Sequence, residues 1–331
     1  MPTLQHIANK FGFVLADVHT RFFELSNVNI KNFLGSTSNF QDIVLKICKI
    51  FPSCDSVRTI NDLRTILYKE LKKEVSELGD NTFTRYFLDG HKIHCLFSVL
   101  QNYSEDEKNK NEDFWVVEKN SVGYFEQLKC IEFCKDFEDL RSFVLKESGI
   151  YRYFEGIDII DGEYQKVYLQ VMKKYYEEYY KLSRSVEYFR EIIFEEIKMF
   201  ILDIYLSLSL RSQLVLFLPG SSSLTFNGEC GSDQRICEYI PVVEEADQFA
   251  IDQITKKLKN VNDFNELEDI FKLESSDLYE GMRLKKIKLY SQSFKSFNDL
   301  SMIYSFLQLR EHQIREVIFV VDQILNKDEQ I

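Results

Sequence analysis

Histidine and cysteine side chains are the groups of this sequence that could bind a metal ion. His91 and His94 are three positions apart and Cys95 follows, so on a helix the two imidazoles would share one face. A zinc site needs further ligands at a suitable spacing, and a zinc protease needs a His-Glu-x-x-His motif. The sequence contains neither pattern. We therefore interpret both histidines as structural and predict no metal or cofactor site.

The seven cysteines indicate free thiols, because their number is odd and their spacings match no zinc motif. They are Cys48, Cys54, Cys95, Cys130, Cys134, Cys230 and Cys237. Cys130 and Cys134 lie one helical turn apart, which is not the spacing of a thioredoxin-like motif. Free thiols are typical of a reducing compartment, and the first residues contain no apolar signal region. We expect a cytosolic location.

Motifs for phosphate binding or hydrolysis are also missing from the sequence. The glycine-containing segment Gly220–Gly231 lacks the Gly-Lys-Ser/Thr ending of a phosphate-binding loop. No Gly-x-Ser-x-Gly sequence offers a serine nucleophile. Neighbouring carboxylates such as Glu177-Glu178 and Glu195-Glu196 are usually solvated faces of helices. We therefore expect a protein that is not an enzyme.

The net charge of −12 restricts the partners of the chain. Nucleic acids and anionic lipids bind surfaces rich in Lys and Arg, so neither is an expected partner, whereas basic proteins are. The longest apolar run, Met199–Leu218, is interrupted by Asp203, Arg211 and Gln213. We expect no direct insertion into a membrane.

Long helices must position whatever sites the chain has, since it contains only 4 Pro and 12 Gly among 331 residues. We predict an all-α fold. Apolar periodicity predicts helices at Gly12–Leu25, Asn39–Phe51, Thr59–Leu78, Thr82–Gln101, Gly123–Glu132, Lys135–Ser148, Glu163–Leu182, Ser185–Leu210, Glu244–Leu258, Asp263–Leu273, Ser276–Gln292 and Phe294–Leu325. Exposed connections are expected at Gln101–Asp113 and Pro219–Arg235, and a short β-prone segment at Phe114–Glu118.

The last predicted helix has one polar position in its apolar stripe. The period calls for an apolar residue near position 311, where the sequence has Glu311, and Arg315 follows four residues later. Acid before base at this spacing is the favourable order for a helical pair. Two interpretations remain open: a half-buried salt bridge, or a polar pair that faces a lumen or a partner chain.

An internal repeat is visible at three places. Asn39–Ile43, Asp136–Leu140 and Asp263–Leu267 each have a polar cap residue, a Phe, a polar residue, an acid and an aliphatic residue. Each is followed by a longer apolar helix, near Lys92, Glu195 and Glu311, at offsets of 52, 58 and 47 residues from the Phe. The pattern predicts three related helical units, at about 10–105, 120–215 and 245–326.

The C-terminal helix resembles the end of a known family. Its residues follow, without a gap, the pattern Phe/Tyr-x-Phe-x-x-Leu-Lys-Glu-x-x-x-Arg-Asn-Ile of subunit d of the V-type ATPases and its archaeal and bacterial relatives. The matching residues are Tyr304, Phe306, Leu309, Arg310, Glu311, Arg315 and Val317, with Glu316 in place of Asn.

Weaker matches cover nearly the whole length in the same order, mostly as hydrophobic pattern. Phe194, Glu195 and Lys198 resemble the family's Phe-Glu-Ala-Asp-Arg-Arg segment, although Ile197 replaces its Asp and Met199 its second Arg. Near Lys92 the family's Ile-Asp-Asn set is reduced to Ile93.

The resemblance implies an all-α fold of three similar units arranged as a funnel. It implies a non-catalytic central-stalk subunit on the cytosolic face of a vacuolar or other endomembrane, as a peripheral part of the membrane sector. The partners would be the ring of proteolipid subunits, the shaft subunits D and F, and the stator subunit a in an inactive state. Such a part transmits the torque that drives proton transport. Glu311, Arg315, Arg310, Glu195 and Lys198 are then the candidate interface residues.

A free α-helical scaffold or adaptor unrelated to ATPases is the alternative from a different functional class. A simple helical solenoid would repeat at about 34–47 residues. The ungapped match from Tyr304 to Val317 and the three units with similar offsets favour the coupling role.

Overall fold

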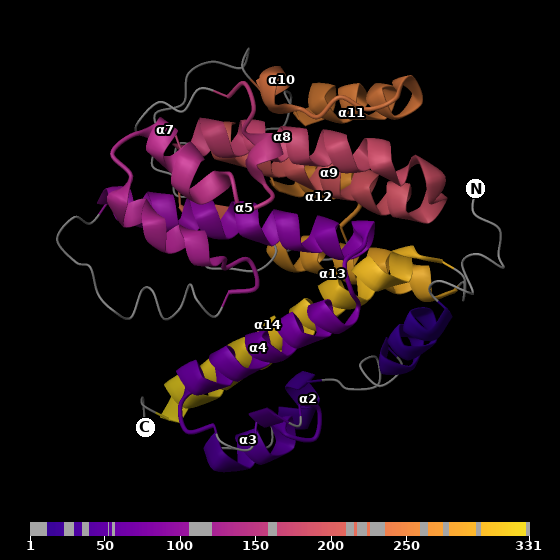
Figure 1. Ribbon diagram of the computed structural model, residues 1–331. Helices are drawn as coiled ribbons and strands as arrows, with labels where there is room; N and C mark the ends of the chain where they lie inside the picture. Colours follow the sequence, from indigo (N-terminus) through magenta and orange to yellow (C-terminus); the bar gives the residue numbers. More distant parts are fainter. Residues whose placement is uncertain are drawn as a thin grey trace. The chain divides into compact units, whose positions relative to one another are not determined.

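The computed structural model describes most of the chain as helix (Figure 1). The described residues are 12–22, 30–34, 40–51, 53–54, 57–105, 121–157, 164–209, 215–216, 224–225, 236–258, 264–273, 278–295 and 299–328. Within them the sole strands are β1 (Val215–Leu216) and β2 (Leu224–Thr225), which pair antiparallel with Leu216 opposite Leu224. The predicted all-α class is confirmed.

The chain divides into two compact units, and the first combines both ends of the chain. Unit 1 comprises Met1–Leu88, Lys110–Tyr124 and Ser293–Ile331, and unit 2 comprises Asp89–Asn109 and Phe125–Gln292. The division falls inside the helix α5 (Thr82–Glu105). This division is based on contacts, whereas the predicted repeats concern similarity of sequence. The three pseudo-repeats and their funnel arrangement therefore stay predictions.

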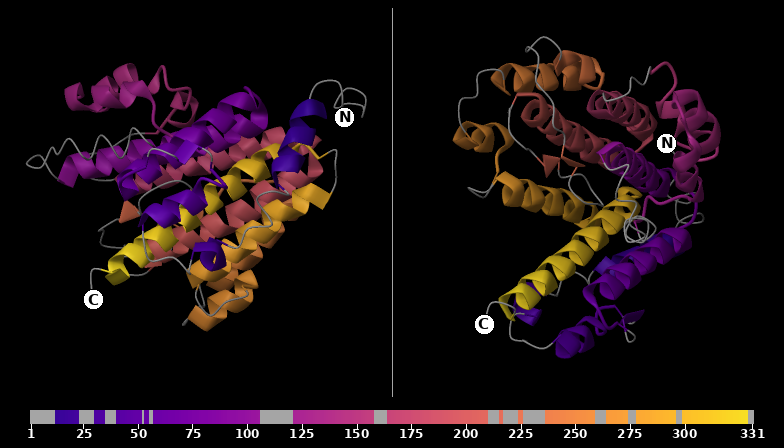
Figure 2. Two further views of the ribbon diagram at one scale, coloured as in Figure 1. Left: turned by 90° about the horizontal axis from the view of Figure 1, so that it is seen from below. Right: turned by 90° about the vertical axis from the view of Figure 1, so that its left-hand side faces the viewer.

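Unit 1 is organised by two long helices, α4 (Ile60–Glu77) and α14 (Ser301–Asp328), which lie side by side (Figures 1 and 2). The short helices α2 (Ile30–Leu34) and α3 (Phe40–Ile47) pack against α14. Residues 12–22 are also helical. Aliphatic side chains fill the space between the two helices. On α4 they are four positions apart, and on α14 they form the apolar face of the helix. These residues are Leu63, Leu67, Leu71, Ile303, Leu307, Ile314, Val317 and Val321.

The start of α4 is determined by two neighbouring polar residues, Thr59 and Asp62. Thr59 Oγ1 accepts a hydrogen bond from the Asp62 amide at 3.1 Å, and the Asp62 carboxylate accepts one from the Thr59 amide at 2.9 Å. This reciprocal capping box satisfies backbone donors that a helix leaves unpaired at its N-terminus. The predicted Thr59–Leu78 helix is confirmed.

The predicted start of the last helix is wrong. The chain forms a short 3₁₀ turn, η7 (Ser293–Lys295), and α14 begins only at Ser301. The Asp299 carboxylate accepts a hydrogen bond from the Ser301 amide at 2.9 Å, so Asp299 caps the new helix. The apolar periodicity of the sequence continues on both sides of Asp299. A prediction based on periodicity alone therefore placed the start of the helix too early.

Unit 2 is built around α8 (Tyr164–Leu182) and α9 (Glu187–Ser209), which pack together and are joined by the turn η5 (Ser183–Ser185). Three C-terminal helices complete it, α11 (Glu245–Leu258), α12 (Phe264–Phe271) and α13 (Leu278–Gln292). The short helix α10 (Ile236–Tyr239) precedes α11 and contacts α8 and α9. Each of these longer elements agrees with its predicted helix within a few residues. The tyrosines of α8 are a packing stripe: Tyr168, Tyr175, Tyr176, Tyr179 and Tyr180 are all buried.

The segment between α5 and α8 differs from its prediction. The expected helix Gly123–Glu132 is a 3₁₀ helix, η2 (Glu126–Phe133). The expected helix Lys135–Ser148 is divided into α7 (Phe137–Leu140) and the π-helical turn η3 (Arg141–Leu145), followed by the 3₁₀ turn η4 (Tyr151–Tyr153). Asp136 caps α7 by accepting from the Asp139 amide. The cap was predictable, whereas the change of helical type was not.

Two predicted connections lie largely outside the described residues. Of Gln101–Asp113, the part up to Glu105 continues α5 as helix, and the remainder is not described. The β-prone segment Phe114–Glu118 and most of Pro219–Arg235 are likewise outside the described part. Among the helices that are described, none combines the length and the apolar character that crossing a membrane requires.

Candidate functional site

Arg310 is the centre of a buried charge cluster in unit 1. Its guanidinium donates to the Glu74 carboxylate at 3.1 Å and to Gln313 Oε1 at 2.7 Å, and it lies 3.7 Å from the Glu70 carboxylate. The guanidinium also lies over the ring of Phe51, 4.0 Å from the ring centroid. Helices α4 and α14 and the turn that ends at Phe51 therefore meet at one cation, so the cluster fixes α14 against α4.

The two glutamates of this cluster are held at a cost. Burial raises the pKa of both the Glu70 and the Glu74 carboxyl above the usual value, and the nearby Arg310 opposes that rise without cancelling it. Glu70 also has an oxygen, Oε2, that is buried without a hydrogen-bond partner among the described residues. Arg310 thus faces both carboxylates, with smaller opposing effects on their pKa values from Lys73 at Glu70 and from Arg21 at Glu74.

Glu311 lies beside this cluster and pairs within its own helix. Its carboxylate accepts from Arg315 at 2.6 Å, and Glu311 is 1% exposed whereas Arg315 is half-buried. Burial raises the pKa of the neighbouring Tyr68 hydroxyl, an effect that the positive Arg315 opposes. The predicted pair therefore exists, and its carboxylate points into the interior of unit 1.

Glu195 and Lys198 form a second cluster, in unit 2. Lys198 donates to the Glu195 carboxylate, Lys285 of α13 lies 3.3 Å from the same carboxylate, and the Lys198 ammonium lies 4.5 Å from the Phe194 ring centroid. Burial would raise the pKa of Glu195, but the two lysines outweigh it and lower that pKa below its usual value. The five predicted site residues therefore fall into two groups, one in each unit.

The structure adds a polar cluster that the sequence did not reveal, centred on Asp89 of α5. Asp89 Oδ2 accepts hydrogen bonds from the hydroxyls of Tyr153 and Tyr179, both at 2.8 Å, and from Arg152 at 2.6 Å. Arg152 also pairs with Glu178 at 3.0 Å. The pKa of the Tyr153 hydroxyl is raised, first by burial and then by the charge of Asp89. Asp89 thus joins α5, η4 and α8 within unit 2.

A glycine makes this approach of α5 to α8 possible. A Cβ at Gly90 would lie 2.9 Å from the Tyr175 hydroxyl oxygen, closer than side chains tolerate. The Asp89-Gly90 dipeptide in the middle of a helix was the one available signal, since glycine there weakens a helix and usually has a packing reason.

Two further groups have unusual titration behaviour. Burial raises the pKa of Asp203 to about 7, and Lys286 opposes the rise. Burial likewise raises the pKa of the Cys134 thiol to about 11, and the thiol donates to the Cys130 carbonyl at 3.3 Å. Cys134 is therefore protonated at neutral pH and is a poor nucleophile.

The predicted structural histidines are both buried, His91 and His94 on α5. Among the described residues, no group of His, Cys, Asp and Glu side chains is arranged to hold a metal ion. Within the described residues, the charges of the Arg310 and Glu195 clusters pair mainly with one another, and these pairs join α14 to α4 and α9 to α13.

Comparison with known proteins adds no assignment to this picture. No model of a known protein family matches the chain, and no curated protein sequence is significantly similar to it.

Proposed function

We propose that the chain is a divergent, non-catalytic coupling subunit of a rotary V-type proton-pumping ATPase, similar to subunit d. In this role it links the shaft of subunits D and F to the proteolipid ring and passes torque between them. The observation that carries the proposal is the ungapped pattern from Tyr304 to Val317 on α14. An all-α fold is compatible with it.

The packing of α14 supports a mechanical role. At about 1.5 Å per residue, its 28 residues span roughly 42 Å. The helix is fixed to α4 at two places, through Arg310 with Glu74 and through Asp322, which pairs with Arg64 at 2.7 Å. A close-packed pair of helices that is joined by ion pairs resists bending, and a subunit that transmits torque needs this stiffness.

The proposed location is the cytosolic face of a vacuolar or other endomembrane. There the chain is a peripheral part of the membrane sector, and the stator subunit a is a further partner in the inactive state. The acidic composition suits a basic shaft foot.

Purification from native membranes tests the proposal. The tagged full chain is isolated in mild detergent without chaotrope, beside a preparation that carries the tag alone. Co-migration with proteolipid ring subunits and with subunits D and F is the expected result. A chain that leaves the membranes on its own, while the ring and shaft stay together, contradicts the proposal.

An α-helical adaptor is the second candidate function. The observation in its favour is an exposed apolar and acidic face on α11, where Phe249 is 66% exposed. Organelle pH in cells that lack the chain separates the two functions, because a coupling subunit is required for acidification and an adaptor unrelated to the pump is not.

A further inference from the structure

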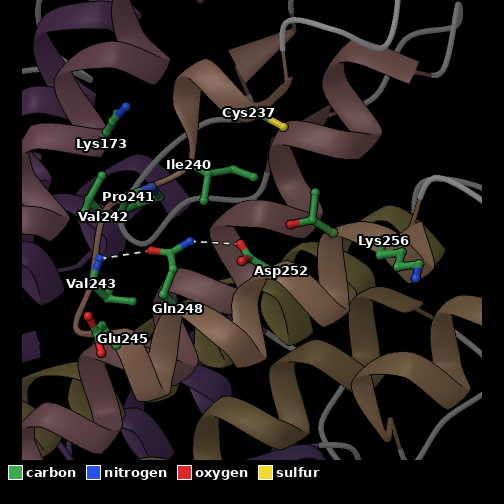
Figure 3. A pocket seen from close by; sticks show the side chains of 11 residues that line it. Lys173, Cys237, Ile240, Pro241, Val242, Val243, Glu245, Gln248, Asp252 and Lys256 are labelled. Atoms are coloured by element: carbon green, nitrogen blue, oxygen red, sulfur yellow. Dashed lines mark hydrogen bonds between the residues drawn. The ribbon is translucent and has the colours of Figure 1, made fainter.

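A hollow of about 530 Å³ lies beside α11 in unit 2 (Figure 3). Its buried lining includes Ile240, Pro241 and Thr255, and its other walls include Val242, Val243 and Gln248. The Gln248 amide closes one side, since it accepts from the Val243 amide at 3.3 Å and donates to Asp252 at 3.0 Å. A volume of several hundred Å³ lined mainly by apolar atoms is the size of site that accepts large side chains.

Two large apolar side chains are exposed next to this hollow. Val242 is 63% exposed on its wall, and Phe249 is 66% exposed on α11. Phe249 follows Glu245 by four positions and precedes Asp252 by three, so the three share one face of the helix. Glu245 and Asp252 both line the hollow, and that face therefore borders it.

The acidic groups on this face have no counter-ion within the described residues. Among the described residues Glu245 has no hydrogen bond or ion pair, and Asp252 accepts a single hydrogen bond, from the neutral Gln248. Of the two lysines that line the hollow, Lys173 donates to the Glu238 carbonyl at 2.7 Å, and Lys256 lies at the C-terminal end of α11. Seven residues on a helix place Glu245 and Asp252 about 10.5 Å apart along the axis.

We propose that this hollow and the adjoining face of α11 form a docking site for a basic amphipathic helix of a partner protein. An apolar side chain of that helix enters the hollow and packs on Val242 and Phe249. Its Lys or Arg residues, about seven positions apart, face Glu245 and Asp252. The same carboxylates repel phosphate, which disfavours nucleic acid and anionic lipid as occupants.

This site shares no residue with the proposed coupling function. The pattern that carries that function is on α14 in unit 1, and the other two candidate interface residues, Glu195 and Lys198 of α9, do not line the hollow. The docking site therefore stands or falls separately from the rotary role.

The site is tested by selecting binders of the full chain from two phage-displayed libraries of helical peptides. Both have randomised apolar positions on one face, and they differ only in having Arg or Glu at two flanking positions seven residues apart. The Arg library is expected to yield binders and the Glu library none. Enrichment of both libraries alike, or of neither, overturns the proposal.

Variants of the protein then locate the binding. Phe249→Ala and the double variant Glu245→Lys/Asp252→Lys are each expected to weaken a selected Arg peptide at least about tenfold, measured by fluorescence anisotropy. The matched controls in unit 2 are the exposed Phe143→Ala and Glu187→Lys/Glu191→Lys, which leave the affinity unchanged. Equal losses in test and control variants overturn the proposal.

A salt titration of the unmodified protein makes the test independent of any variant. Between about 0.05 and 0.5 M salt the affinity for the Arg peptide is expected to fall, because exposed charge pairs are screened. Affinity that is insensitive to salt contradicts the assigned role of the two carboxylates. Circular dichroism of each variant confirms that the helices are intact.

Discussion

Arg310 and Glu311 are adjacent residues of opposite charge, and both are buried inside unit 1. A buried ion pair contributes little net stability, because desolvation of the charges offsets their attraction. Removing one partner is different, since the remaining charge then stays buried without compensation. The cluster as a whole therefore contributes little to the free energy of unfolding, whereas the loss of one of its charges lowers that free energy strongly.

Arg310→Ala tests this dependence. At neutral pH we expect the free energy of unfolding to fall by about 3–5 kcal/mol, because Glu74 and Glu70 lose their cation. Urea unfolding measures the loss. The control is Arg64→Ala, whose partly exposed pair with Asp322 is expected to contribute less than about 1 kcal/mol. Similar losses for both variants would show that the Arg310 cluster behaves as a surface pair.

Glu311→Gln separates the two interpretations of the α14 pair. The substitution keeps the shape of the side chain and removes the charge that the half-buried Arg315 faces. Because Glu311 is buried, we expect about 1–3 kcal/mol lower stability of the isolated chain by thermal unfolding. If the isolated chain is unaffected while proton pumping in the assembled complex is lost, the pair acts at an interface instead.

Asp203→Asn tests the effect of a raised pKa on stability. The folded protein holds the Asp203 proton up to a pKa of about 7, against a usual value of 3.8, so between these values it binds more protons than the unfolded chain. The free energy of unfolding then falls as pH rises through this window. Asparagine does not titrate, so its advantage over the wild type is expected to grow from about pH 4 to about pH 7. A difference that stays constant with pH would contradict the assignment.

Sequence reasoning predicted the local pair Glu311–Arg315 and named Glu195 and Lys198 through the family resemblance, but it missed the distant partners of both clusters and the whole Asp89 cluster. Glu311 with Arg315, and Glu195 with Lys198, are four and three positions apart, where helical geometry makes the pairing predictable. Glu74 lies 236 positions from Arg310. Such a partner depends on how helices pack, which the spacing of residues along one helix does not specify.

At the scale of elements, caps decided where prediction succeeded. The helix predicted from Thr59 begins at that place, because Thr59 caps α4, whereas the cap at Asp299 was overlooked and α14 was predicted to start too early. The approach of α5 to α8 was also not predicted, because a single glycine permits it and single glycines have several possible causes.

Gly90→Ala is the test of that approach. The added methyl group would meet the buried Tyr175 hydroxyl, so we expect about 1–3 kcal/mol lower stability, even though alanine favours helix more than glycine does. The double variant Gly90→Ala/Tyr175→Phe removes the nearest atom and is expected to recover part of the loss. Chemical unfolding of the four proteins of this cycle measures the coupling. Additive effects would show that the two residues do not interfere.

At the scale of the whole molecule, the sequence predicted helix content but not how the chain divides. Unit 1 takes its α4 and α14 from opposite ends of the sequence, and the boundary with unit 2 falls inside a continuous helix. Composition shifts and loops mark a boundary only when it coincides with a linker, and α5 has no such mark near Leu88.

Each unit has its own core, so we expect a core substitution in one unit to raise hydrogen exchange in that unit only. Leu307→Ala, at a fully buried position of α14, is expected to cost about 2–5 kcal/mol and to raise hydrogen exchange in α14 and α4 while α8 and α9 keep their protection. Leu169→Ala, equally buried in α8, is the mirror control and should give the opposite pattern. Uniform loss across both units would mean that they unfold as one.

The composition of unit 1 has a consequence during synthesis on the ribosome. Glu74 emerges 236 residues before Arg310, which at about 5–20 residues per second corresponds to on the order of 10–50 s. Throughout that interval the apolar row of α4, with Leu63, Leu67 and Leu71, has no α14 to cover it. We therefore expect a chaperone that binds apolar helices to cover this row until α14 has been synthesised and released from the ribosome.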